Sequence, residues 1–304
     1  MKLDNITKNL LAEISGLHEI PNGAVSIRKN GKSEVLKSSA NIEIFKKTDC
    51  EGIDVVVHSN CKGEACHIPV VVSENNFHDL VYNDFYIEEN AEVLIVAGCG
   101  LHSNGDASHN GIHSFHVGKN AKVTYVENHL AIGKGKNKVL NPITKIEIEE
   151  NGVMVINTTQ IGGVDYSERK TEAKLKKNAL LEVNEKVLTS RFNVAKTDFK
   201  VTLNGENSRC NIVSKSVAKD ESEQVFKSNL VGKNSCFGRV ECDAILLNSA
   251  KVISVPKISA LHKDSSLSHE ATVGKIAMEQ LIKLMTLGLN EKQAEEKIIE
   301  GFLK

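Results

Sequence analysis

The sequence predicts a mainly β fold in which short strands stack into a solenoid, with one helix at the start and a helical hairpin at the end. Three observations predict it. Apolar and polar residues alternate from about residue 23 to 260, a corner motif recurs at a nearly constant interval within that region, and helical spacing of apolar residues is confined to the two ends.

Residues 1–20 are expected to form an N-terminal helical segment. Apolar residues recur at helical spacing through residues 6–17, Asp4 or Asn5 can cap the helix, and Gly16 can end it. No apolar signal segment follows Met1, and no stretch approaches the ~18 continuous apolar residues that a membrane span needs. A cytoplasmic protein is therefore expected.

Residues 21–272 are expected to form the solenoid. An asparagine, a small residue, any residue and usually an aliphatic residue recur at intervals of 27 to 31 residues, and a partial copy at Ser249 follows after about half an interval. Asparagine tolerates the left-handed backbone of a sharp corner, and two strands per coil would explain the half interval. A β-sandwich with turns every 8–12 residues is the alternative, and the regular corner favours the solenoid. The corners begin at Asn90, Asn120, Asn151, Asn178, Asn207 and Asn234.

Residues 273–304 are expected to form two helices. Apolar residues follow a helical stripe up to Met285, and Gly288 can end the first helix. Asn290 with Gln293 predicts a capping box for the second helix. The hairpin either covers the open edge of the solenoid or docks another protein.

Composition excludes several classes of function. With 38 basic and 39 acidic residues, nothing indicates nucleic acid as the main partner, and 4% aromatic content without tryptophan leaves few surfaces for stacking sugars. Seven cysteines indicate free thiols or metal ligands rather than a disulfide framework. Motifs of phosphate-binding loops, hydrolase nucleophiles and zinc proteases are missing, so we expect a scaffold and not an enzyme.

Thiols and imidazoles gather in residues 99–116, which the local glycines and asparagines predict to be a mobile loop. Cys99, His102, His109 and His113 are candidate ligands for a soft or borderline metal, or the histidines belong to an ordinary polar loop. A second pair, Cys61 and Cys66, has zinc-ligand spacing, with two ordinary thiols as the alternative.

A third group comprises Cys242, His269 and Glu270. Cys242 alternates with apolar neighbours and faces inward, either as a buried core residue or as a ligand. His269 and Glu270 are adjacent on a strand, so only one of them can face a given site.

The segment Leu267-Ser268-His269-Glu270-Ala271-Thr272-Val273-Gly274, together with Gly288-Leu289 and Gly301-Phe302, resembles the carboxy terminus of the SufB/SufD iron–sulfur assembly proteins. Upstream, Val126-Glu127, Ser214-Lys215 and Cys242-Asp243 resemble further steps of that family. The resemblance is closest to the short, single-protein variety of minimal systems.

This resemblance implies a right-handed parallel β-helix that pairs through its C-terminal end, here as a homodimer, and that carries an iron–sulfur cluster or iron only transiently. No group is expected to stay tightly bound in an aerobic preparation. It also implies docking of a SufC-type ABC ATPase on the C-terminal helices. Lys215 and Glu127 become candidates for the path of sulfur, and Lys215 is expected to lower the pKa of a thiol. The docking candidates are Ile276, Leu281, Leu284, Met285, Leu289 and Phe302.

This sequence departs from the family pattern in two places. Leu267 stands where SufD-like chains carry cysteine, and residues 248–252 hold no cysteine where SufB-like chains have one. Two other functions therefore stay open: a metal store that uses the 99–116 segment, and a carbohydrate-active β-helix enzyme.

Overall fold

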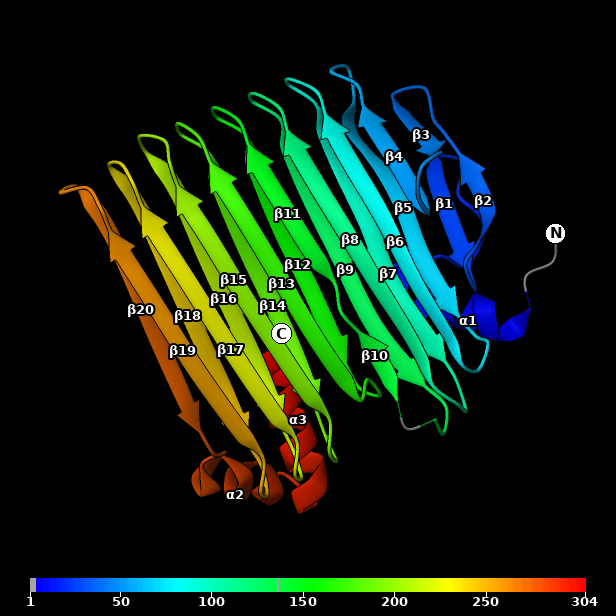
Figure 1. Cartoon of the computed structure of the whole chain (residues 1–304). Coiled ribbons are helices and arrows are strands. Elements are labelled where there is room, and N and C mark those ends of the chain that lie inside the picture. Colours follow the sequence, from blue (N-terminus) through cyan, green and yellow to red (C-terminus); the bar gives the residue numbers. More distant parts are fainter. Residues whose placement is uncertain (1–3, 136) are drawn as a thin grey trace.

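The computed structural model describes residues 4–135 and 137–304, and it confirms the predicted solenoid (Figure 1). Strands make up 59% of the chain and helices 11%, arranged as a β-solenoid of about 8 turns with a short N-terminal helix and two C-terminal helices. Residues 1–3 of the predicted N-terminal segment lie outside the described residues.

The strands form two facing sheets, with ten strands on the main path of one and nine on the main path of the other, and successive coils give one strand to each sheet. This confirms two strands per coil. In the first sheet, sheet A, the order is β2 (Lys32–Lys37), β1 (Ala24–Lys29), β5 (Lys62–Val72), β7 (Glu92–His102), β9 (Lys122–Ile132), β12 (Val153–Ile161), β14 (Leu180–Thr189), β16 (Ser208–Ala218), β18 (Cys236–Leu246) and β20 (Ser265–Gly274).

In the opposite sheet, sheet B, the order is β19 (Lys251–Ala260), β17 (Glu223–Gly232), β15 (Val194–Leu203), β13 (Tyr166–Leu175), β10 (Lys138–Leu140), β8 (Ala107–Val117), β6 (Phe77–Ile87), β4 (Gly52–Val57) and β3 (Ile42–Lys46). Strand β11 (Ile143–Ile148) also pairs with β8 and β13. Neighbours are parallel except at the N-terminal end, where β1 pairs with β2, and β3 with β4, in antiparallel fashion.

The corners have the predicted left-handed asparagines. The φ angles of Asn90, Asn120, Asn151 and Asn178 lie between 55° and 64°. The side-chain amides of Asn120, Asn151 and Asn178 each donate to the corner asparagine of the coil before, at 3.0 Å, 3.0 Å and 2.9 Å, so the corners form a ladder. Asn207 is left-handed too, whereas Asn234 is not among the positive-φ residues that the structure describes. The ladder ties the register of each coil to the next.

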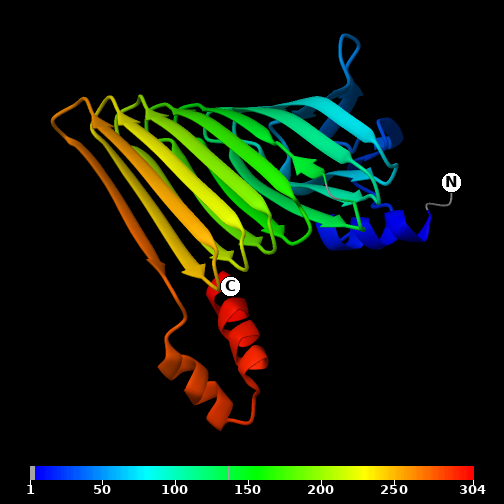
Figure 2. The ribbon, with the colours of Figure 1, turned by 60° about the horizontal axis from the view of Figure 1, so that its bottom comes forward.

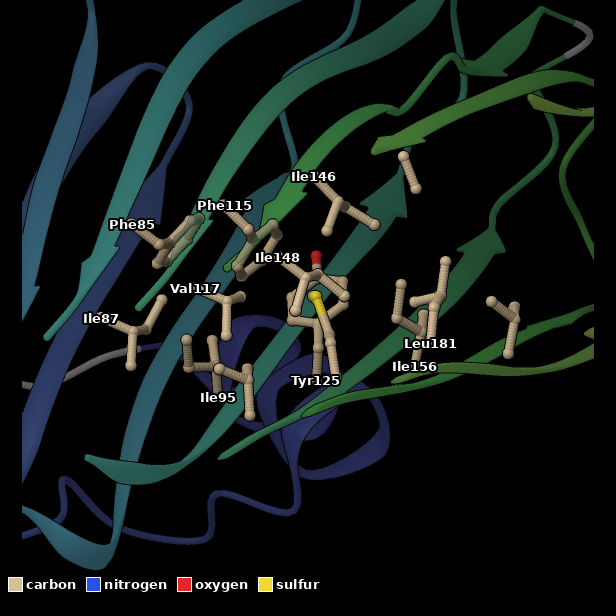
Figure 3. Close-up of a cluster of buried hydrophobic side chains, with 14 of the residues drawn as sticks. Phe85, Ile87, Ile95, Phe115, Val117, Tyr125, Ile146, Ile148, Ile156 and Leu181 are labelled. Carbon is tan, nitrogen blue, oxygen red and sulfur yellow. The ribbon is translucent and has the colours of Figure 1, made fainter. Parts of the chain in front are cut away.

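Aliphatic and aromatic side chains fill the space between the sheets (Figure 3). Phe85 stacks on Phe115 with ring centroids 4.4 Å apart, and Tyr125 meets Phe115 edge-on at 5.0 Å. All three rings are buried, and they anchor the core of the N-terminal half.

Helix α1 (Asn5–Ser15) covers part of the outer face of sheet A over β7 and β9. The Asp4 carboxylate accepts the Thr7 backbone N–H at 2.9 Å, and Gly16 ends the helix with a φ of 66°, as predicted. Leu10 and Ile14 are buried in this contact.

The C-terminal end carries the predicted hairpin, which begins later than expected because β20 runs to Gly274. Helix α2 (Met278–Thr286) has no buried residue, whereas α3 (Glu291–Leu303) returns to the solenoid, where Ile299 and Leu303 pack with Val217. The hairpin projects from one edge of the C-terminal half (Figure 2). Asn290 and Gln293 form the predicted capping box. No helix in the described part of the chain has the length and apolarity that crossing a membrane requires.

Candidate functional site

The expectation of a mobile loop over residues 99–116 is wrong. Strand β7 ends at His102 and β8 begins at Ala107, so only residues 103–106 form a turn. The glycines provide space and not flexibility: a Cβ on Gly98 would lie 2.7 Å from the carbonyl oxygen of Ile14, and one on Gly111 would lie 2.9 Å from Nε2 of His113.

This segment does bring candidate residues together inside the solenoid. Cys99, His109, His113, Glu127 and His129 help to line a cavity of about 20 Å³, room for about one water molecule. Burial raises the pKa of the Cys99 thiol well above its usual range, so the thiol is held neutral. His102 is on the opposite phase of β7, so it faces away from this interior.

A buried ionic group adjoins this cavity. Asp79 accepts from Arg28 at 2.9 Å and contacts Nδ1 of His109 at 3.1 Å. Burial opposes the charge on Asp79, but these two partners outweigh it and lower the pKa of the carboxyl group to about 2. The aspartate is thus the charged partner that holds β1 against β6 and β8.

The interior charges continue along the solenoid axis. Arg169 donates to Glu127 at 2.5 Å, and its Nε lies 3.8 Å from Glu185. Glu185 accepts from Thr197 at 3.0 Å and from Ser214 at 2.7 Å, which leads toward the C-terminal coils. We call this set the axial polar network: Arg28, Asp79, His109, His113, Glu127, His129, Arg169, Glu185 and Ser214.

The two glutamates of the network differ. Burial opposes the charge of Glu127, but Arg169 and the neighbouring histidines outweigh it, and the pKa lies well below its usual range. Burial raises the pKa of Glu185 despite the same arginine. Arg169 itself stays charged.

Arg169 and Glu185 were missed by the sequence reasoning, although a signal for both was present. In β13, Ser167, Arg169 and Thr171 share the inward phase with apolar Ala173, and in β14, Glu185 sits between inward Val183 and Val187. A charged residue on the apolar phase of a strand marks a buried polar site.

A second polar group lies at the last coils, and we call it the open-end cluster: Cys242, Ser254 and His269. Cys242 faces inward from β18 and is 1% exposed, as expected. Burial raises the pKa of its thiol to about 11. The Nε2 of His269 and the hydroxyl of Ser254 are buried without a hydrogen-bond partner in the described part of the chain. Such atoms are expensive to bury unless a ligand satisfies them.

Glu270 faces the other side of β20, as strand alternation requires. Its carboxylate accepts from Arg239 at 3.0 Å on the exposed outer face. Lys215 is also on the outer face, with its ammonium 5.8 Å from the centre of the Phe302 ring, whereas the thiols of Cys210 and Cys242 face inward. Lys215 therefore has no structural support as the residue that lowers the pKa of a thiol.

The docking candidates fall into three groups by their exposure. Ile276 and Phe302 are partly buried against the solenoid. Met285 on α2 is exposed, and the remaining candidates are half-buried: Leu281, Leu284 and Leu289. Three large apolar side chains that were not in the predicted set are also exposed near Met285: Met278, Ile282 and Leu287.

All seven cysteines are free thiols. Cys61 and Cys66 belong to the main apolar core, and burial raises the pKa of Cys66 to about 12. Within residues 4–135 and 137–304, no three His, Cys, Asp or Glu side chains are grouped so that they could hold a metal ion.

Known proteins resemble the chain over most of its length. The family described as "SUF system FeS cluster assembly, SufBD core domain" matches residues 74–302. An iron-sulfur cluster assembly SufBD family protein of Methanocaldococcus jannaschii is 30% identical over 78% of this chain and 75% of that protein. One from Archaeoglobus fulgidus is 29% identical over 79% of this chain and 64% of that protein, and one from Pyrococcus horikoshii is 28% identical over 96% and 84%.

Proposed function

The chain belongs to the SufBD family of iron–sulfur cluster assembly proteins, and from this premise we propose that it is a non-catalytic cytosolic scaffold whose C-terminal solenoid end receives a nascent cluster. The open-end cluster carries the proposal. It combines a thiol and an imidazole, which are ligands for iron, with buried polar atoms that have no partner in the described chain.

We further propose that this end pairs with a second copy of the chain. Strands β19 and β20 are the last strands of their sheets, so each offers an edge of unpaired backbone groups. Exposed apolar side chains, among them Ile253, Val255, Ile258 and Leu261, lie on β19 and directly after it. A twofold pair would supply two copies of Cys242 and His269 to one seam.

Iron binding would also convert the neutral Cys242 thiol into the thiolate that a cluster ligand requires. Cys242 is neutral in the single chain, and only the thiolate form of cysteine binds iron well. An incoming metal ion displaces the proton of a coordinating thiol, so a rearrangement that admits iron activates Cys242. Upstream, Glu127 and the rest of the axial polar network offer a polar route for sulfur toward the same end.

Helix α2 is the proposed docking surface for a SufC-type ABC ATPase. An amphipathic helix with no buried residue and with Met278, Ile282, Met285 and Leu287 exposed fits an apolar groove on a partner. Because α3 is packed on the solenoid, movement of a docked ATPase would reach the open end through it.

Replacing Cys242 by serine, or His269 by alanine, should abolish cluster formation. The measurement is anaerobic addition of iron and sulfide to the chain with its ATPase, followed by the visible absorption spectrum and by sedimentation. Cys210→Ser is the matched control, because Cys210 is a buried inward thiol of the neighbouring strand β16. Full cluster formation by both the Cys242 and the His269 variant would contradict the proposed site. A cluster that forms on a monomer would contradict the proposed pairing.

Replacing both Ile282 and Met285 by aspartate should remove ATPase binding while the thermal unfolding midpoint stays unchanged. Both side chains are exposed, so the substitution costs the fold little, yet it places charge in the proposed contact. Co-purification with the ATPase is the measurement. The control is Glu291→Lys with Lys292→Glu in the exposed first turn of α3, which should retain binding. Undiminished binding by the aspartate variant would place the docking surface elsewhere.

A further inference from the structure

The backbone donors at the open end follow from the ladders of the coils before it. In both sheets, residues with outward side chains direct the N–H to the preceding coil: Arg209 donates to the carbonyl oxygen of Ala179 at 2.8 Å, and Lys251 to that of Ser222 at 2.9 Å. The direction alternates along a strand, so residues with inward side chains direct the N–H to the following coil. Because β19 and β20 are the last strands of their sheets, those N–H groups face the open end (Figure 1).

The open edge of β20 is centred on His269. Ser265 uses its N–H in the preceding turn, 3.1 Å from the carbonyl oxygen of His262, and the later inward residues keep theirs for the open end. Two copies of β20 related by a twofold axis at His269 would therefore pair in antiparallel fashion along the whole strand. The inward residues of β20 are Ser265, Leu267, His269, Ala271 and Val273.

The open edge of β19 is centred on Pro256. Proline has no backbone N–H, so the central donor of this edge is missing, and such an edge is where a sheet tolerates proline. The donors on the two sides of the gap remain. The inward residues of β19 are Val252, Ser254, Pro256, Ile258 and Ala260.

The registers of the two sheets show which residues of the last coils face each other across the interior. Glu185 of sheet A accepts from Thr197 of sheet B at 3.0 Å. Two steps along the parallel ladders, the position of Glu185 becomes that of Cys242, and the position of Thr197 becomes that of Ser254. Cys242 on β18 therefore faces Ser254 on β19.

Pro256 and His269 occupy the same position along their strands. The chain runs in opposite directions in the two sheets, so Pro256, two residues after the partner of Cys242, faces Val240, two residues before it. Val240 is in register with His269 on β20. One twofold axis perpendicular to the sheets can therefore pass through both Pro256 and His269.

The inference drawn here rests on the proposed pairing of two copies. We propose that His269 and Pro256 lie on the twofold axis of the pair, and that the break at Pro256 is the entrance by which iron and sulfide reach the open-end cluster. Sheet A would be closed by a continuous ladder with the two His269 side chains adjacent. Sheet B would lack the two hydrogen bonds that residue 256 of each copy would otherwise exchange, directly opposite those imidazoles.

The register is tested by placing one new thiol on β20 of the full chain and oxidising the sample. Directly opposed, hydrogen-bonded residues of antiparallel strands have Cα atoms ~5.5 Å apart, within the range of a disulfide. With His269→Cys, peptide mass spectrometry should therefore find a disulfide that joins position 269 of two copies. Ala271→Cys is the matched control. Its own copy would lie roughly 13 Å away along the strand, so it should form no such disulfide.

The entrance is tested with Pro256→Ala, which supplies the missing N–H to each copy. The dissociation constant of the dimer in sedimentation should fall about tenfold or more, the effect of two added hydrogen bonds. Cluster absorbance after anaerobic addition of iron and sulfide, with the ATPase present, should rise about tenfold more slowly because the entrance is closed. Lys257→Ala is the matched control: it is exposed beside Pro256, but its N–H faces β17, so neither quantity should change.

The outcomes separate this inference from the pairing beneath it. A wild-type chain that stays monomeric would refute both. A dimer in which His269→Cys forms no disulfide, or in which Pro256→Ala pairs no more tightly, would refute the register and leave the pairing standing. A Pro256→Ala dimer that is tighter but gains absorbance at the wild-type rate would make Pro256 only a guard against unwanted strand pairing, and it would overturn the entrance.

Discussion

A chain with Arg169→Met should lose about 3–5 kcal/mol of its free energy of unfolding, which is the cost of leaving a buried charge without its partner. Arg169 is 7% exposed and donates to Glu127 at 2.5 Å, with Glu185 3.8 Å away. Methionine fills much of the volume but leaves two carboxylates facing an apolar interior. Urea denaturation followed by circular dichroism measures the loss.

Two further variants show whether the effect comes from charge. Adding Glu127→Gln to Arg169→Met removes one stranded carboxylate and should restore part of the lost stability. Lys174→Met removes an exposed cation with a glutamate partner, and should change stability by about 1 kcal/mol or less. If Arg169→Met and Lys174→Met were equally stable, the buried network would contribute nothing to the fold.

Lowering the pH from 6.5 to about 4 should destabilise the protein, with His113 alone contributing on the order of 3 kcal/mol. Burial lowers the pKa of His113 from 6.5 to about 4. The unfolded chain therefore binds a proton at this residue throughout that window, and the folded chain does not. The stabilisation is complete above pH 6.5 and is lost as the pH falls toward 4.

The variant His113→Gln separates this contribution from that of other groups. His113 contacts the Tyr125 hydroxyl at 2.9 Å, and glutamine keeps a polar partner there without titrating. The slope of unfolding free energy against pH between 4 and 6.5 should be shallower in the variant. His116→Gln, on the exposed face of the same strand, should change the slope much less. Identical slopes for wild type and His113→Gln would contradict the prediction.

The repeating features of this fold could be predicted because they depend on local backbone chemistry. Asn120 and its counterparts are at corners that need a left-handed residue, and Asp4, Gly16 and Asn290 cap helices by contacts within a few residues. Such signals are visible in the chain itself. Alternation likewise predicted the inward position of Cys242.

Long-range packing could not be predicted in the same way. Gly98 looked like a loop residue because its reason for being glycine is Ile14 of α1, far away in sequence. Arg169 on β13 and Glu127 on β9 belong to opposite sheets, so no local pattern in the sequence predicts that they form an ion pair. Family resemblance named Lys215, but only the packing of α3 showed that its side chain faces outward toward Phe302.

Because the coils stack in parallel, the number of coils sets the length of the solenoid. Each coil adds one strand spacing of about 4.8 Å, so about 8 turns separate the antiparallel end from the open end by roughly 40 Å. Because the asparagine ladder repeats from coil to coil, one extra coil of 27 to 31 residues could lengthen the solenoid without altering either end. The number of coils therefore sets how far apart the two ends are held, independently of the residues that each end presents.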